Sequence, residues 1–178
     1  GGRKIIHMEV GQPGTPAPKL AKNILSKELQ NNNLGYTVSL GLPDLRNRIS
    51  KLYGEWYNLD LNPERVIVTT GSSGAFILSF ATLFDAGDRV GIGSPGYPSY
   101  RQILKAQNLV AVDIQTELEN KFQPIADDII KNNLNGLLIA SPANPTGSML
   151  DKNSLKKLME CSKDNNVSFI SDEIYHGI

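Results

Sequence analysis

Two alternating hydrophobic patterns constrain the fold of this 178-residue chain more than any other feature of its sequence. Short runs of aliphatic and β-branched residues, typical of buried strands, alternate with longer segments whose apolar residues recur every three or four positions, as in amphipathic helices. Strands that alternate with helices predict an α/β fold with a mainly parallel sheet. Because the crossover connections are right-handed, helices are expected on both faces of this sheet.

The expected strands and helices follow one another without a visible linker or internal repeat. Strands are expected over residues 65–70, 89–92, 109–114, 136–140 and 167–171. Helices are expected to begin near residues 17 and 43 and to cover residues 72–84, 99–107, 125–132 and 151–163. The helix over 72–84 is apolar nearly all round, so we expect it to be mostly buried. Asp151 should cap the last helix, because aspartate is favoured at that position.

The first part of the chain differs in character from the rest. Residues 11–16 form an irregular stretch rich in glycine and proline before the first helix. We therefore expect residues 1–34 to belong to a smaller domain and residues 35–178 to form a larger, ligand-binding domain that is truncated at its C-terminal end. The chain begins without a methionine and stops just after a strand-like segment, which favours a fragment over a complete protein.

Composition argues against several classes of function. Lys plus Arg and Asp plus Glu number 18 each, so no basic excess favours nucleic-acid binding. No apolar run approaches the ~20 residues of a membrane span. The single cysteine, Cys161, cannot form an internal disulfide, which fits a cytoplasmic protein. No metal site is expected.

Polar loops follow four of the expected strands, over residues 71–74, 93–98, 141–147 and 171–175. Ligands of open parallel sheets bind beyond the carboxyl ends of the strands, so these loops should meet at one edge of the sheet. Together they would supply hydroxyls, backbone N–H groups, an aromatic ring, an amide and a carboxylate. The first loop opens a helix and could cradle a phosphate, although a plain serine N-cap is the simpler interpretation of that loop alone.

Residues 91–96 match the GxGxxG pattern of dinucleotide-binding proteins, and Asp113 lies near the usual acidic position. We favour an ordinary glycine- and proline-rich loop, because Pro95 and Pro98 disrupt the smooth turn from strand to helix that a pyrophosphate requires. A lone match of this kind is weak.

Taken together, the motifs resemble those of the class I and II aminotransferases, pyridoxal-phosphate (PLP) enzymes of fold type I. The matching segments cover nearly the whole chain in the family's order, and they are residues 11–13, 36–46, 69–75, 94–100, 141–147 and 172–175. The resemblance implies that the larger domain is the PLP-binding domain. It also implies a homodimer that acts on an amino acid and a 2-keto acid.

The resemblance also implies roles for individual residues at the phosphate and at one face of the ring. Gly71, Ser72 and Ser73 would hold the phosphate of PLP through N–H and hydroxyl groups. Tyr97 would stack on the pyridine ring.

The remaining implied contacts are polar. Asp172 would pair with the pyridine nitrogen and favour its protonated form, and Asn144 and Tyr175 would hydrogen-bond the ring oxygen O3′. Tyr36 would reach the phosphate bound by the other subunit, and Gly11 would lie near the substrate carboxylate.

The implied activity is transamination, in which the cofactor carries an amino group from an amino acid to a 2-keto acid. The family's Schiff-base lysine lies downstream of the segment that ends at Tyr175, and the chain ends three residues later. No residue of this chain is therefore assigned as catalytic, and we expect the chain on its own to be inactive.

Three other functions remain open at this stage. A fold type I lyase or synthase, such as a C–S lyase, would share the same cofactor contacts. A transcription regulator could carry such a domain as a non-enzymatic effector sensor, and an NAD-linked oxidoreductase rests only on the GxGxxG match. The sequence does not identify the substrate, and neither His7 nor His176 carries a functional signal.

Overall fold

The computed structural model describes residues 5–6, 11 and 14–177. The chain divides into two compact units, and the division falls between Arg65 and Val66. The domain boundary expected after residue 34 remains a prediction.

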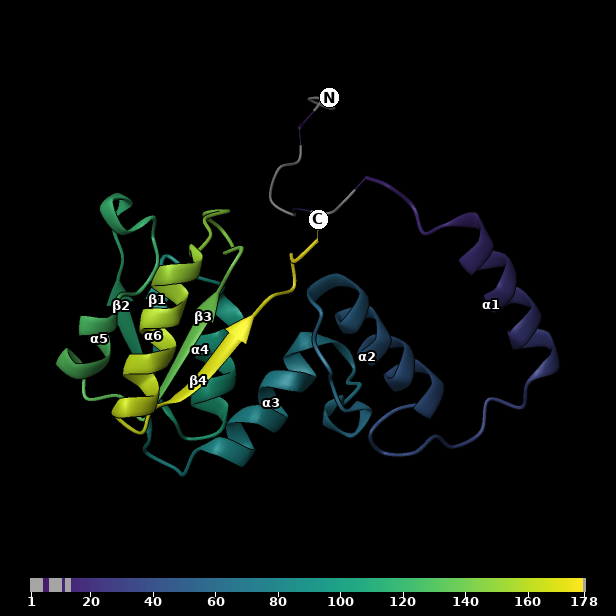
Figure 1. Ribbon diagram of the computed structural model, residues 1–178, viewed down its shortest axis with the longest axis horizontal. Helices are drawn as coiled ribbons and strands as arrows, with labels where there is room; N and C mark the ends of the chain where they lie inside the picture. Colours follow the sequence, from purple (N-terminus) through teal and green to yellow (C-terminus); the bar gives the residue numbers. More distant parts are fainter. Residues whose placement is uncertain (1–4, 7–10, 12–13, 178) are drawn as a thin grey trace. The chain divides into compact units, whose positions relative to one another are not determined.

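The described residues of the first unit form two α-helices and one short 3₁₀ helix (Figure 1). They are α1 (Lys19–Asn31), α2 (Pro43–Tyr57) and η1 (Pro63–Arg65). Both predicted helices are therefore confirmed. Proline is the first residue of α2, where its missing N–H would have no partner within the helix. The hydroxyl of Ser50 on α2 donates to the carbonyl of Leu61, which ties α2 to the segment before η1.

The second unit is an α/β domain with a parallel sheet. Its elements are α3 (Gly71–Leu83), β1 (Arg89–Ser94), α4 (Pro98–Ala106), β2 (Val110–Gln115), η2 (Leu118–Asn120), α5 (Ala126–Lys131), β3 (Gly136–Ala140), α6 (Lys152–Asp164) and β4 (Ser168–Asp172). The four strands pair in the order β2-β1-β3-β4, and every pairing is parallel. The predicted fold class is confirmed.

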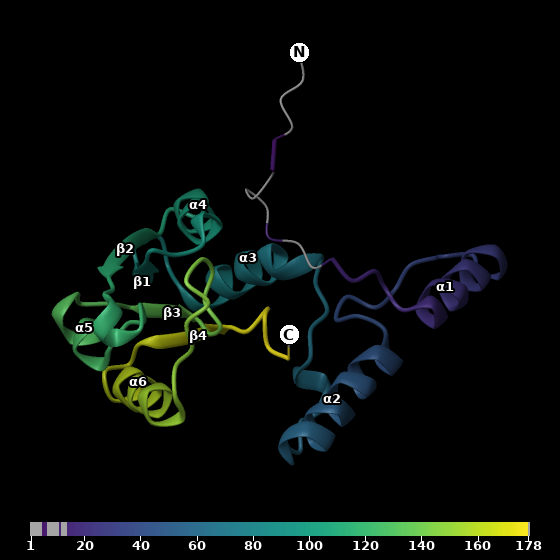
Figure 2. The same cartoon turned by 90° about the horizontal axis from the view of Figure 1, so that it is seen from above.

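Helices cover both faces of this sheet, as the crossover rule predicts. In Figures 1 and 2, α4 lies on one side, whereas α5 and α6 lie on the other. The side chains of β3 alternate between the two faces: Leu138 joins a core with residues of α3 and α4, and Leu137 and Ile139 join a core with residues of α5 and α6. Two hydrophobic cores thus fix the sheet between its helices.

The strand predicted over residues 65–70 is wrong. Arg65 ends η1, the backbone from Val66 to Thr69 joins no ladder, and Ile67 and Val68 are exposed. The segment has the composition of a buried strand, but no strand among residues 5–6, 11 and 14–177 pairs with it. β-Propensity reflects packing against neighbours, so sequence composition alone does not place a segment in a sheet.

The prediction that the helix over 72–84 is mostly buried also fails. Only Phe76 and Phe80 of α3 are buried, and Ile77, Leu78 and Leu83 are exposed. A helix that is apolar all round buries only the sides that have a neighbour, and α3 packs on α4 along one side.

Candidate functional site

A pocket of about 130 Å³ opens at the carboxyl edge of the sheet, within the second unit. It is lined by Ser72, Tyr97, Tyr100, Ala140, Pro142, Asn144, Asp172, Ile174 and Tyr175. The lining comes from the first turn of α3, the start of α4 and the segments that follow β3 and β4. The structure therefore brings the four predicted loops together, with five of the predicted site residues in one pocket.

The first turn of α3 offers backbone N–H groups to this pocket. Gly71 has a φ of +81°, a conformation that glycine adopts without strain, and a Cβ built on it would meet nothing within 4 Å. Thr70 does not cap the helix with its side chain. The N–H groups at a helix start lack intrahelical partners and carry a partial positive charge, so the turn that holds Ser72 and Ser73 suits an anion.

Asp172, the last residue of β4, places a carboxylate in the pocket. Its side chain is buried, its Oδ1 accepts a hydrogen bond from the backbone N–H of Ile174 at 3.1 Å, and its Oδ2 accepts one from the phenol of Tyr100 at 2.5 Å. Among the residues that line the pocket, Asp172 supplies the only carboxyl group, and no Lys, Arg or His is present. A buried carboxylate without a countercharge is costly, so this pocket suits a ligand that brings a cation to Asp172.

Tyr100 is the site residue that the sequence analysis missed. It is 4% exposed, and its ring meets those of Phe76 and Tyr97 edge to face, with centroids 5.2 and 5.4 Å away. Burial, followed by the hydrogen bond and the negative charge of Asp172, raises the pKa of Tyr100 far above its usual value, so the phenol remains a donor. The motif over residues 94–100 includes Tyr100, but nothing in the sequence shows that its hydroxyl reaches a residue 72 positions away.

The loop that carries Asn144 is held in place by a buried amide. The Nε2 of Gln123 donates to the carbonyls of Ala140 and Ser148 at 3.0 and 3.3 Å, which spans the two ends of the loop. The hydroxyl of Ser141 accepts from the N–H of Leu150 at 3.1 Å. These bonds fix the loop, and Asn144 lines the pocket from it.

The two other aromatic residues of the prediction lie at the pocket mouth. Tyr97 directly precedes α4 and is 36% exposed, and Tyr175 follows β4 and is 37% exposed. Each can present a ring or a hydroxyl to a ligand. Gly71 and Ser73 adjoin Ser72 in the first turn of α3.

Two predicted residues belong to the first unit. Gly11 and Tyr36 are both exposed, and the ring of Tyr36 has no burial at all. Their roles remain predictions, because the pocket is built from the second unit alone.

The glycine pattern over residues 91–96 does not form a dinucleotide loop. Gly91 and Gly93 lie inside β1, and a Cβ on Gly91 would come within 2.6 Å of Leu134, so this glycine serves close packing. Asp113 forms an ion pair with Arg101. The place of these glycines in β1 and the ion pair of Asp113 both favour an ordinary loop over a dinucleotide site.

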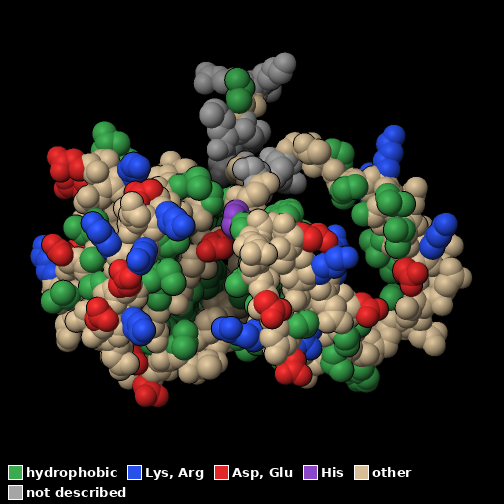
Figure 3. Space-filling view, in the orientation of Figure 1, with side chains coloured by type: hydrophobic (Ala, Val, Ile, Leu, Met, Phe, Trp, Pro, Cys, Tyr) green, Lys and Arg blue, Asp and Glu red, His purple; other side chains and the backbone are tan. Residues whose placement is uncertain are grey.

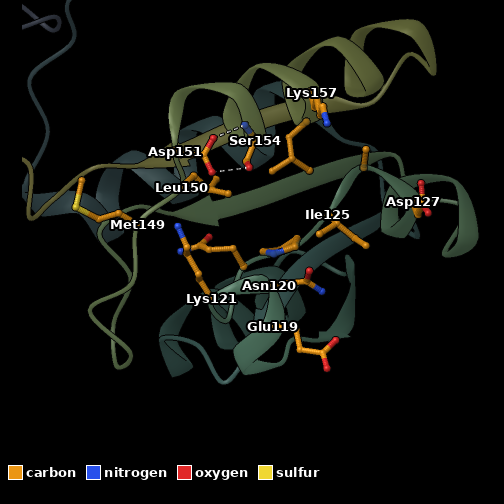
Figure 4. Close-up of a pocket in the computed structure, with 14 residues that line it drawn as sticks. Glu119, Asn120, Lys121, Ile125, Asp127, Met149, Leu150, Asp151, Ser154 and Lys157 are labelled. Atoms are coloured by element: carbon orange, nitrogen blue, oxygen red, sulfur yellow. Dashed lines mark hydrogen bonds between the residues drawn. The ribbon is translucent and has the colours of Figure 1, made fainter.

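A second and larger cavity, of about 360 Å³, lies between the η2–α5 segment and the start of α6 (Figure 4). None of the predicted site residues lines it. The N-terminus of α6 is already capped there, because Asp151 accepts hydrogen bonds from the N–H groups of Asn153 and Ser154, both at 3.0 Å. The predicted cap is confirmed.

The cysteine and the two histidines, to which the sequence assigns no function, either have structural partners or lie outside the described residues. The thiol of Cys161 contacts the carbonyl of Ala126 at 3.5 Å, and the ring of His176 lies 3.6 Å from the carboxylate of Glu173. His7 lies outside the described residues. In the part of the chain that the structure describes, no group of three or more His, Cys, Asp or Glu could hold a metal ion. None of the described helices has the length and apolarity needed to cross a membrane.

The parallel sheet and the pocket define an α/β domain whose candidate site combines a helix start suited to an anion, aromatic rings and a buried carboxylate. The family model described as "Aminotransferase class I and II" matches residues 3–178. The chain belongs to the class I and II aminotransferase family.

Individual relatives agree with this assignment. A valine–pyruvate aminotransferase from Mycobacterium tuberculosis is 41% identical over 176 residues, which are 98% of this chain and 45% of the relative. The structure of a protein from Silicibacter pomeroyi, provisionally assigned as an aminotransferase, is 58% identical with a TM-score of 0.89 and covers 99% of this chain and 45% of that one. An aminotransferase structure from Mycobacterium tuberculosis gives 42% identity and a TM-score of 0.92 over 95% of this chain and 44% of that one. The chain thus spans about half the length of these relatives.

Proposed function

We propose that the full-length protein containing this chain is a PLP-dependent aminotransferase, which moves an amino group between an amino acid and a 2-keto acid. The observation that carries the proposal is Asp172, a buried carboxylate in a pocket whose lining supplies no cation. A protonated pyridine nitrogen is the partner that such a carboxylate favours. Family membership supports the same cofactor.

The pocket fits the rest of the cofactor by the chemistry of its donors. Ser72 and Ser73, beside Gly71, would hold the phosphate at the uncapped start of α3. Tyr97, at the pocket mouth, would stack on the face of the pyridine ring. When bound, PLP supplies an electron sink for the negative charge that develops at the Cα of the amino acid.

Other residues of the chain orient the ring and complete the site. Asn144 and Tyr175 would hydrogen-bond the ring oxygen O3′, and both line the pocket with Asp172. We further propose a cytoplasmic homodimer in which the fully exposed Tyr36 reaches the cofactor phosphate of the other subunit, while Gly11 lies near the substrate carboxylate.

The test uses the full-length protein and its Asp172→Asn variant. Wild type should retain PLP after dialysis and release a 2-keto acid when it is given amino acids. The variant should lose roughly hundredfold or more of that rate, the scale of removing one partner from a buried charge pair. Asp113→Asn is the matched control, because Asp113 pairs with Arg101 outside the pocket. Retention of PLP with release of ammonia or a thiol, and no amino-group transfer to a keto acid, would overturn transamination.

A further inference from the structure

Asp172 and Tyr100 share the shortest hydrogen bond within the pocket. The phenol of Tyr100 donates to Oδ2 of Asp172 at 2.5 Å, and both side chains are buried. Tyr100 lies on α4 and Asp172 at the end of β4, so the bond joins a helix on one face of the sheet to a strand end.

The ring of Tyr100 has little freedom to move its hydroxyl elsewhere. Phe76 of α3 packs edge to face against it at 5.2 Å, and Tyr97 does so at 5.4 Å. Because Tyr100 is part of the same hydrophobic core as Phe76 and Leu104, any other direction for the ring would cost packing contacts.

The carboxylate of Asp172 is therefore held through both of its oxygens. Oδ1 accepts from the N–H of Ile174 at 3.1 Å, and Oδ2 accepts from Tyr100. Each carboxylate oxygen can accept more than one hydrogen bond, so both keep capacity for a donor in the pocket. A carboxylate fixed in this way meets a ligand cation without first having to reorganise.

We propose that Tyr100 is a positioning residue, which holds the carboxylate of Asp172 toward the ring nitrogen of the bound cofactor. This role rests on the proposed function, because it presupposes that Asp172 meets PLP. Tyr100 acts through Asp172 and does not touch the reacting atoms. Burial and the neighbouring carboxylate raise the pKa of the Tyr100 phenol, which favours its protonated, hydrogen-donating form.

The experiment is a double-mutant cycle in the full-length protein with Tyr100→Phe and Asp172→Asn. Affinity for PLP is measured by equilibrium dialysis, and the absorption spectrum of the bound cofactor is recorded for each variant. Tyr100→Phe should weaken PLP binding roughly tenfold and shift the spectrum in the same direction as Asp172→Asn. The double variant should bind no more weakly than Asp172→Asn alone, because the hydroxyl acts only through the carboxylate.

The control is Tyr53→Phe, which removes a tyrosine hydroxyl from α2 in the first unit. It should leave the PLP affinity and the spectrum at wild-type values. Additive losses in the cycle, or a wild-type affinity and spectrum in Tyr100→Phe, would overturn the positioning role. If Tyr100→Phe does not fold, Tyr100→His is measured instead, because histidine keeps a hydrogen-bond donor at this place. PLP binding by Tyr100→His within roughly threefold of wild type supports the positioning role, and a weaker affinity refutes it. Failure of the wild-type protein to retain PLP would instead overturn the proposed function itself.

Discussion

Gly71 is the residue at which the backbone of the site is most constrained. Its φ of +81° disfavours any residue with a Cβ, although the space around it is open. Gly71→Ala should therefore destabilise the protein by about 1–2 kcal/mol through backbone strain, not through a clash. Urea denaturation measures the loss. Gly35→Ala is the control, because Gly35 also has open space around it but no positive φ, and equal losses in both variants would contradict this explanation.

The predicted site residues that line the pocket are those whose position depends on a strand end or a helix start. Asn144 and Asp172 lie at or beyond the carboxyl ends of β3 and β4, so topology brings them together, whereas Ser72 reaches the same pocket from a helix start that no described strand precedes. Tyr100 could not be predicted in this way. Its role depends on how α4 packs against α3 and on the direction of one hydroxyl, which hydrophobic periodicity does not specify.

Among the elements, α6 allows a pH-dependent prediction at its N-terminus. Hydrogen bonds from the N–H and the hydroxyl of Ser154 lower the pKa of Asp151 below 3.8, its ordinary value. The charged carboxylate therefore stabilises the folded state above that ordinary value, and the contribution is lost as the pH falls through the lower, folded-state pKa. Asn caps helices nearly as well but does not titrate. The excess stability of wild type over Asp151→Asn should thus be present at neutral pH and vanish in acid.

Urea denaturation at a series of pH values measures this difference. Asp164→Asn is the matched control, because Asp164 is the last residue of the same helix, where the helix dipole does not favour a carboxylate. An excess stability of wild type over Asp151→Asn that stays constant into acid would show that the charge of Asp151 does not contribute.

The elements themselves were largely predictable, and the exceptions share one cause. The helices α1 to α6 and the strands β1 to β4 fall where hydrophobic periodicity places them, and those of the second unit each have a neighbour that buries part of their apolar surface. The segment from Val66 to Thr69 and the outer side of α3 have the same apolar character but lack such a neighbour among the described residues. Hydrophobic periodicity predicts which side of a helix or strand is apolar. It does not predict whether another element covers that side.

At the scale of the whole chain, the pocket of the second unit is lined by aromatic rings, hydroxyls, an amide and a carboxylate but by no amine. Neither Lys nor Arg lines the pocket at the carboxyl edge. The chain spans about 45% of the valine–pyruvate aminotransferase that it resembles. Under the proposed function these residues would bind and orient the cofactor, whereas proton transfer at the substrate would require a group that they do not provide.

The first unit exposes apolar side chains along α1, and their effect on self-association can be tested. No residue of α1 is buried, yet Leu20, Ile24, Leu25 and Leu29 recur at helical spacing and are all more than half exposed, and apolar side chains along α1 are visible in Figure 3. An apolar stripe of this kind favours self-association. The 178-residue chain should therefore associate in a concentration-dependent way, and an Ile24→Lys, Leu25→Lys variant should associate less while keeping its helix content.

Sedimentation velocity measures the association of this chain, and circular dichroism measures its helix content. Asn23→Lys is the matched control, because it adds a positive charge to α1 without removing an apolar side chain, and it should associate as wild type does. The double variant loses no buried contact in the structure, so it should unfold at the wild-type temperature. A lower melting temperature in the double variant alone would mean that the apolar side chains of α1 are packed within the monomer. Unchanged association would mean that self-association arises from another surface, and the exposed side of α3 would be varied next.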